Sequence, residues 1–282
     1  MAIIDQQTSF DPDRLTASVI GIAAEVGKHD SGLHHHQKGQ LLFAAQGCIR
    51  FALDDSICIL PPTKAVWIPA FTRHRALMTN VVAYRSLYFD SAVFKGPNQI
   101  TMIDVNDLLK ALIDKMALWP WDTPEEQMKN TTALFWEEFH AAQRHTFQLP
   151  LPSNRRFKAF RETLIQATFL APDLISLAHS VGASSKTVTR LFKAETGMSY
   201  QEWKQQWRLL KAVELLSKGM PVNQVSDWLG FSSDSAFIAF FKKQTGQTPL
   251  SFIKNKQGVS TLNCANASHK KSITLSMTIL YR

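Results

Sequence analysis

A repeated pattern in the second half of the chain constrains its fold more than any other feature. One copy runs from Gly182 to Gly197, and the other runs from Gly230 to Gly246, about 49 residues further along. In each copy the first glycine is followed two residues later by a serine (Ser184 or Ser232), and then by a Phe-Lys pair and a Thr-Gly pair. Glycine readily ends a helix in the left-handed conformation, and serine caps the next helix by accepting a backbone N–H. The repeat therefore predicts two helix-turn-helix units.

The segment between the two copies predicts a long helix. Ser199 and Glu202 form a capping-box pattern, after which apolar residues recur on one face as far as about residue 216. About 18 residues at 1.5 Å each give a rod of roughly 27 Å, which suits two helices held about one DNA turn, ~34 Å, apart. Its cations Lys204, Arg208 and Lys211 either contact phosphate or are ordinary solvated charges.

Charge is distributed unevenly between the two halves. Residues 1–152 carry a net charge of −3, whereas residues 153–257 carry +8. This asymmetry is expected of a chain whose second half meets a polyanion, although an ordinary surface imbalance produces the same split.

The composition excludes several classes of protein. Of the 282 residues 45% are hydrophobic and 19% charged, which excludes collagen, a coiled coil and wholesale disorder. No apolar run approaches the ~20 residues that cross a bilayer, so we expect no membrane partner, and the first residues lack the layout of a secretory signal. Cys48, Cys58 and Cys264 cannot build a disulfide framework or a thiolate zinc site, so we expect a reducing, cytoplasmic location.

The first half reads as short strands without helical periodicity. Seven segments carry this pattern: residues 16–24, 41–45, 48–53, 56–60, 65–68, 74–78 and 82–89. Closely spaced short strands are typical of an antiparallel sandwich or a small barrel. We expect one of these two arrangements over residues 1–102, the antiparallel β-barrel being the one that the histidine motifs described below imply. The whole chain is expected to be a multi-domain α+β protein whose C-terminal domain is all α.

A helical period begins near residue 103. Leu109, Leu112 and Met116 recur at helical spacing, and Thr123 followed by Pro124 predicts the start of a second helix. This helical pair, residues 103–147, either closes the open end of the barrel or supplies a dimer interface. Residues 148–154 contain two prolines and are interpreted as an interdomain linker, and residues 255–282 as a disordered tail.

Residues 155–254 resemble the AraC/XylS-type DNA-binding domain. The resemblance rests on Gly182-x-Ser184, Arg190-Leu-Phe-Lys193, Glu195-Thr-Gly197, Gly230-Phe-Ser-Ser, Ala236-Phe-Ile, Phe241-Lys and Gly246-x-x-Pro249. It implies a cytoplasmic transcriptional regulator whose third and sixth domain helices enter the major groove of an operator and recruit or block RNA polymerase. The base-facing positions that match are Lys186, Thr189, Arg190, Asp234, Ser235, Ala236 and Ile238. We expect phosphate contacts from Ser184, Lys193, Arg208, Ser232 and Lys242.

One position departs from the pattern of that family. The second recognition helix often carries an arginine where this chain has Ala239, and it holds no cation before Lys242. We therefore predict that the first recognition helix, led by Arg190, makes most base-specific polar contacts, and that the second contributes apolar contact and shape readout.

Histidines in the first half resemble the two motifs of cupin barrels. His34 and His36 with Gln40 match the first motif, and Pro69 followed by His74 matches the second, over about residues 15–90. The resemblance implies a cupin-like barrel that binds an effector and often dimerises. Because Gln40 replaces the acidic metal ligand and Phe71 replaces the turn glycine, we expect no metal and no cofactor. We expect instead that His34, His36, Gln40 and His74 make polar contacts to a small molecule. Trp67 is either an apolar contact to that molecule or part of the core.

The leading hypothesis is a one-component regulator, not an enzyme, in which a small molecule alters operator binding through a hinge at Pro150–Pro152. A cupin-type metalloenzyme that carries a DNA-targeting domain is the alternative, and a nucleoid protein without sequence preference is a third reading. The effector, the sign of regulation (activator or repressor) and the oligomeric state, with a homodimer as one option, are left open. We predict that deletion of residues 258–282 leaves operator affinity within about threefold at fixed salt.

Overall fold

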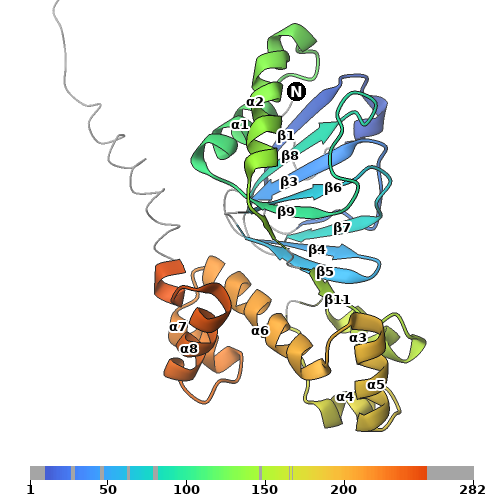
Figure 1. Ribbon diagram of the computed structural model, residues 1–282, viewed down its shortest axis with the longest axis vertical. Coiled ribbons are helices and arrows are strands. Elements are labelled where there is room, and N and C mark those ends of the chain that lie inside the picture. The colour runs from blue at the N-terminus through green and yellow to red at the C-terminus, as the bar shows by residue number, and fades with distance from the viewer. Residues whose placement is uncertain are drawn as a thin grey trace, which may run out of the picture.

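The computed structural model describes residues 10–26, 29–44, 48–61, 64–78, 82–145, 148–164, 166 and 168–252. The chain builds two β-sheets first and a group of helices afterwards (Figure 1). The tail interpreted as disordered, including Cys264, lies outside the described residues. None of the helices that the structure describes has the length and apolar character needed to span a membrane.

The strands of the first half are antiparallel and short. Their bounds are β1 Val19–Val26, β2 His29–Asp30, β3 Gly39–Ala44, β4 Ile49–Leu53, β5 Ser56–Leu60, β6 Lys64–Ile68, β7 His74–Met78, β8 Val82–Phe89, β9 Thr101–Asp104, β10 Arg144–His145 and β11 Gln148–Pro150. All seven segments expected from the sequence form strands. The four that it did not indicate, β2, β9, β10 and β11, have two to four residues each, too few for an alternating pattern to be read.

The strands form two separate sheets, so the expectation of a closed barrel is wrong. The six-stranded sheet has the order β1-β8-β3-β6-β9-β10, and the five-stranded sheet has the order β11-β5-β4-β7-β2. Among the described residues no ladder joins an edge of one sheet to an edge of the other. The physical reason is that each sheet is covered on both faces, by the other sheet on one side and by helices on the other, which is the environment of a layered sandwich.

Strand β3 shows how the layers are built. Leu41 and Phe43 belong to the apolar cluster under the helices α1 (Asp107–Ala117) and α2 (Glu125–Ala141), whereas Leu42 and Ala44 belong to the cluster between the two sheets. Successive strand residues point to opposite faces, so one strand serves both layers. The helical pair therefore covers the outer face of the six-stranded sheet (Figure 1).

The two helices of this pair begin in different ways. Asn106 caps α1 through its side chain, which accepts a hydrogen bond from the Leu109 amide. Pro124, rather than the expected Thr123, is the N-cap residue of α2, and it makes no side-chain cap. The Thr123 hydroxyl donates instead to the Pro120 carbonyl.

The second half is helical. A short 3-10 helix at Arg155–Phe157 leads into α3 (Lys158–Leu164), α4 (Leu174–Ser180), α5 (Ser185–Thr196), α6 (Tyr200–Ser217), α7 (Val222–Trp228) and α8 (Asp234–Thr245). The predicted long helix is confirmed as α6, including its capping box, in which the Ser199 side chain accepts from the Glu202 amide and the Glu202 carboxylate accepts from the Ser199 amide. Pairs α4–α5 and α7–α8 lie towards opposite ends of α6 (Figure 1).

The two halves share one apolar core. Ile59 and Leu149 of the five-stranded sheet lie in the same cluster as Trp203 and Leu210 of α6. The segment interpreted as a linker begins as β11, which pairs with β5, and the Trp203 indole N–H donates to the Pro150 carbonyl at 2.8 Å. The full stack is therefore the α1–α2 pair, the six-stranded sheet, the five-stranded sheet and then α6 (Figure 1).

Candidate functional site: a helical DNA-binding surface and an inter-sheet cavity

The helix pairs α4–α5 and α7–α8 have matching geometry. Ser184 caps α5, and Ser233, one residue after the expected Ser232, caps α8. Val188 and Phe237 are the fourth residues after their caps, and both are fully buried. The additional residue of the second copy therefore lies in the turn before the cap, and the two capped helices have the same phase.

The predicted base-facing residues of α5 share an exposed face. Lys186, Thr189 and Arg190 are all exposed. In α8, Asp234 and Ser235 are exposed, whereas Ala236 and Ile238 are half-buried. Ala239, which is exposed, is the sixth residue after the Ser233 cap, as Arg190 is the sixth after Ser184.

Four of the predicted phosphate contacts, Ser184, Lys193, Ser232 and Lys242, are exposed. The cations on α6 are already engaged within the protein. Arg208 lies over the Phe231 ring, 5.0 Å from its centroid, and the Lys204 ammonium donates to the Pro172 carbonyl. Lys211 is 2% exposed, so the interpretation of this residue as a phosphate contact or a solvated charge is wrong. An ion pair with Glu214 and a contact with the Trp228 ring hold it in the interior.

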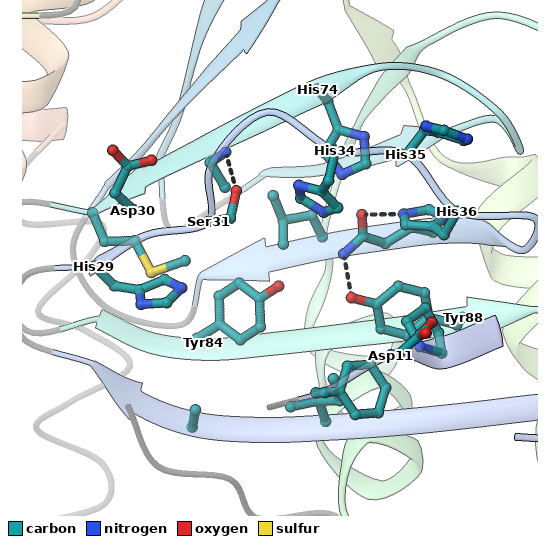
Figure 2. A pocket seen from close by; sticks show the side chains of 18 of the residues that line it. Asp11, His29, Asp30, Ser31, His34, His35, His36, His74, Tyr84 and Tyr88 are labelled. Atoms are coloured by element: carbon teal, nitrogen blue, oxygen red, sulfur yellow. Dashed lines mark hydrogen bonds between the residues drawn. The ribbon is translucent and has the colours of Figure 1, made fainter. Parts of the chain in front are cut away.

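A cavity of about 590 Å³ lies between the sheets of the first half, and Figure 2 shows it from close by. Polar side chains from β3, β7, β8 and the segment before β3 point into it. Four of the five predicted effector contacts line it: His34, His36, Gln40 and His74. The structure thus brings together residues from motifs that are more than 30 positions apart in the sequence.

Backbone pairing fixes two of these histidines side by side. His34 and His74 exchange both backbone N–H···O bonds, of 3.0 and 2.9 Å, in an isolated antiparallel bridge, and their ring centroids lie 4.3 Å apart. The His36 ring centroid is 5.1 Å from that of His74. Donor nitrogens of the three residues lie within 4.8 Å of one another, the spacing of a site that holds a metal ion.

Gln40 connects this cluster to the tyrosines on the other side of the cavity. Its Oε1 lies 3.1 Å from His36 Nε2, and its Nε2 donates to Ser86 Oγ. The same nitrogen donates to the Tyr88 hydroxyl, and Figure 2 draws the contacts with His36 and Tyr88. Burial lowers the pKa of His74 to about 3 and lowers that of His36. Burial also raises the pKa of Tyr88 well above its usual value. The imidazoles of His36 and His74 and the phenol of Tyr88 are therefore neutral near pH 7.

Trp67, the fifth predicted contact, does not line the cavity. It lies in the outer face of β6, where its ring packs on Phe89, Trp136 and Phe139 and its N–H donates to the Pro97 carbonyl. Sequence reasoning missed Tyr84 and Tyr88, which do line it. The signal was the period-two spacing of Tyr84, Ser86 and Tyr88 in β8, which gives these residues one face of the sheet.

A buried ion cluster joins the two halves below the cavity. The Arg50 guanidinium of β4 donates to Glu214 Oε2 of α6 from Nε at 3.2 Å and from Nη2 at 2.7 Å. The ammonium groups of Lys211 and Lys218 also donate to Glu214. Burial raises the pKa of the Glu214 carboxyl, but the charges of Arg50, Lys211 and Lys218 and the hydrogen bond from Arg50 outweigh it and bring that pKa to about 2.

Comparisons with known proteins agree with this division into two halves. Residues 177–255 match the family model of the helix-turn-helix domain. The chain is 28% identical over 254 residues to the HTH-type transcriptional regulator NimR of Escherichia coli strain K12, an alignment that covers 89% of this chain and 93% of NimR. It is 35% identical over 81 residues to the arabinose operon regulatory protein of the same organism, covering 28% of each.

Among solved structures, that of ToxT from Vibrio cholerae bound to an unsaturated fatty acid aligns with 85% of this chain and 96% of ToxT, at 10% identity and a TM-score of 0.33. The helix-turn-helix match and the nearly full-length similarity to NimR place the relatives among regulators of transcription. Residues 177–255 therefore form an AraC-type helix-turn-helix domain, and the chain is a DNA-binding transcriptional regulator.

Proposed function

We propose that this regulator is controlled by a small molecule that binds in the inter-sheet cavity and changes the affinity of α5 and α8 for an operator. The observation that carries the proposal is the cavity itself, with His34, His36, Gln40 and His74 directed into it. A concave site with a few convergent polar groups is the usual form of a ligand site.

Successive side chains of β4 point to opposite faces of the sheet, so this strand contacts the cavity wall on one face and the helices on the other. Phe51 packs between the sheets, with its ring centroid 5.4 Å from that of His74. Arg50, its neighbour, points to the opposite face and holds Glu214 of α6. A ligand that moves His74 therefore bears on the strand that positions α6, and α6 connects the two helix pairs.

Both helix pairs act as helix-turn-helix units in this proposal. Helix α5 would make most base-specific polar contacts through Lys186, Thr189 and Arg190, and α8 would contribute apolar contact and positioning. Exposure of Lys186 and Arg190 on one face of α5 supports this assignment, as does the absence of a cation at Ala239.

The same proposal includes a homodimer formed through the α1–α2 pair and contact with RNA polymerase at the promoter. Leu108 of α1 and Leu134 of α2 are both more than a third exposed, and this proposal takes them as apolar surface that the partner subunit would cover. Sedimentation of the purified chain, compared with a Leu108→Glu and Leu134→Glu double variant, tests the dimer.

The test of the effector proposal begins with selection of operator sequences from random DNA by the full chain. Binding to the selected operator is then measured at fixed salt with and without a panel of small metabolites. We expect at least one compound to change the operator affinity of the wild-type chain but not that of the Tyr88→Phe variant, which loses only the hydroxyl that accepts from Gln40. The matched control is Tyr200→Phe, whose hydroxyl bonds to Pro172 far from the cavity. Compounds that act equally on both variants would overturn the assignment of the site.

A further inference from the structure

The connecting segment, residues 148–157, is hydrogen-bonded to the last turn of α5. Glu195 Oε2 accepts from the Asn154 amide at 2.7 Å and from the Ser153 hydroxyl at 3.0 Å. We call these two hydrogen bonds the brace. Phe157, at the end of the segment, is fully buried, and its ring meets the Phe192 ring of α5 edge-on, with 5.7 Å between the centroids. The backbone that joins the two halves therefore contacts the first recognition helix directly.

Two arginines hold this segment in place. Arg161 Nη1 donates to the carbonyls of Pro152 and Asn154. Arg156 Nη1 donates at 3.2 Å to the Gly182 carbonyl, in the turn that precedes α5. Hydrogen bonds therefore join the connecting segment both to the turn before α5 and, through the brace, to the last turn of that helix.

Glu195 lies on the side of α5 that is turned away from the predicted base contacts. At about 100° per residue, it is rotated by about 140° from Arg190 and by about 180° from Lys186. It follows Val188 by seven residues, about two helical turns, and Val188 is fully buried. The brace therefore holds α5 from behind and does not cover the exposed face of that helix.

The second helix pair offers a direct comparison. Gln244 holds in α8 the place of Glu195 in α5, since each is the eleventh residue after its cap, Ser233 or Ser184. Among the described residues no hydrogen bond joins Gln244 to the first half. Its side chain is exposed and lines a cavity of about 290 Å³, which α6, α8 and the strands β5 and β6 enclose. The position that is braced in α5 therefore faces a cavity in α8.

We propose that Glu195 is a positioning residue for operator binding, because the brace gives α5 the orientation that its base contacts require. The connecting segment begins as β11, so the brace ties α5 to the five-stranded sheet, whereas α8 is joined to that sheet through α6. A shift of α6 over the sheet would therefore change the position of α8 relative to α5. This inference rests on the proposed role of α5, and its link to an effector rests on the proposed cavity site.

The first experiment compares two DNA sequences at one salt concentration. One is the selected operator, and the other has different bases at the positions where Arg190→Ala changes the base preference. We expect Glu195→Ala to weaken binding to the operator about fivefold and to leave binding to the altered sequence within about twofold. The matched control is Gln244→Ala, which should leave both affinities within about twofold.

The direction of the change separates positioning from simple electrostatics. Removal of an acidic charge strengthens the attraction of a protein to phosphate, so a Glu195 that acts only as a charge predicts tighter binding by Glu195→Ala. Glu195→Gln keeps an oxygen that accepts both hydrogen bonds, and it should bind at least as tightly as the wild-type chain. Ser153→Ala changes no residue of α5, and it should weaken binding to the operator alone by about twofold.

Three results would overturn the role of Glu195. These are unchanged binding by Glu195→Ala, tighter binding by that variant, and an equal loss on the operator and on the altered sequence. An equal loss is also the result that a misfolded variant gives, and in that case Ser153→Ala decides: if it too fails to distinguish the two sequences, the brace does not position α5. Ser153 is exposed, so its hydroxyl is removed without opening the core.

The link to an effector is measured separately. A compound that changes the operator affinity of the wild-type chain should have no effect on that of Glu195→Ala. A compound that acts equally on both chains would overturn coupling through the brace and leave the proposed effector site standing. If no compound acts on the wild-type chain, the effector proposal fails, whereas the two DNA sequences still decide the role of Glu195.

Discussion

Arg50 of strand β4 and Glu214 of helix α6 form a buried ion pair across the boundary between the two halves, with 2.7 Å between Nη2 and Oε2. Their side chains are 8% and 1% exposed. Arg50 Nη1 also donates to the carbonyls of Leu164 and Gln166, so one guanidinium fastens the sheet both to α6 and to the end of α3. This contact holds the five-stranded sheet of the first half against the helical second half.

Replacement of Glu214 by Gln should destabilise the protein strongly. The substitution leaves Arg50 and Lys211 buried without their counter-charge, and removal of one partner from a buried pair typically costs about 3–5 kcal/mol. Urea unfolding followed by tryptophan fluorescence measures the change. The matched control is Asp54→Asn, whose contact with Arg73 is 3.8 Å long and exposed, and which should cost about 0–1 kcal/mol. Similar losses in both variants would contradict the importance of burial.

The same carboxylate predicts a loss of stability in acid. The pKa of Glu214 is lowered from 4.5 to about 2 in the folded protein, so its contribution is fully present above pH 4.5 and disappears as the pH falls towards 2. The difference in free energy of unfolding between the wild-type chain and Glu214→Gln should therefore shrink between pH 5 and pH 2.5. A difference that stays constant over this range would show that the ion cluster does not lower the pKa of the Glu214 carboxyl.

Arg190 should specify one base pair of the operator. Its guanidinium is exposed on α5 and suits bidentate contact with guanine, so Arg190→Ala should cost about 1–3 kcal/mol of operator binding and relax the preference at one position. Selection from random DNA compares the two proteins at one salt concentration. An unchanged base preference would contradict the role.

A substitution at the matching position of α8 tests DNA contact by a gain of affinity. Ala239 is exposed and holds the same place after its cap as Arg190. Ala239→Arg should add a phosphate or guanine contact and tighten binding, with a steeper dependence of affinity on salt. No change in either quantity would show that this face of α8 does not reach DNA.

Phe71→Gly should stabilise the protein. Phe71 has a φ of 62°, in the left-handed region, and is 65% exposed, so glycine relieves about 1 kcal/mol of backbone strain at little loss of packing. The reverse control is Gly32→Ala, where a φ of 67° makes alanine unfavourable although its Cβ meets no neighbour. The thermal unfolding midpoint should rise in Phe71→Gly and fall in Gly32→Ala. A fall in the first variant or a rise in the second would contradict this account.

Local signals of the sequence predicted the elements well. The serine, glycine and capping-box positions predicted α5, α6 and α8, because caps act within a few residues of the chain. The same signals placed the second cap at Ser232, whereas Ser233 forms it, because the repeat alone does not show which side of the turn carries the additional residue.

Long-range contacts were not predictable in the same way. The histidines of the cavity were found because motif spacing carries them, but Tyr84 and Tyr88 were missed. Of the two roles left open for Trp67, a ligand contact or part of the core, the structure shows the core. Which face of a strand meets the cavity depends on how two sheets stack. Neither the strand pattern around Arg50 nor the helix pattern around Glu214, 164 positions away, indicates that the two residues pair.

The hydrogen bond from the Trp203 indole N–H to the Pro150 carbonyl holds the connection between the two halves against α6. The connecting backbone enters the helical half while still paired in a sheet, and Glu195 then accepts from the Asn154 amide. Among the described residues, the segment from Gln148 to Asn154 is therefore held by hydrogen bonds at both of its ends. If a small molecule in the cavity controls operator binding, as proposed, its effect would reach the helix pairs as a shift of α6 over the sheet by about 1–2 Å, the scale on which packed helices move between two arrangements.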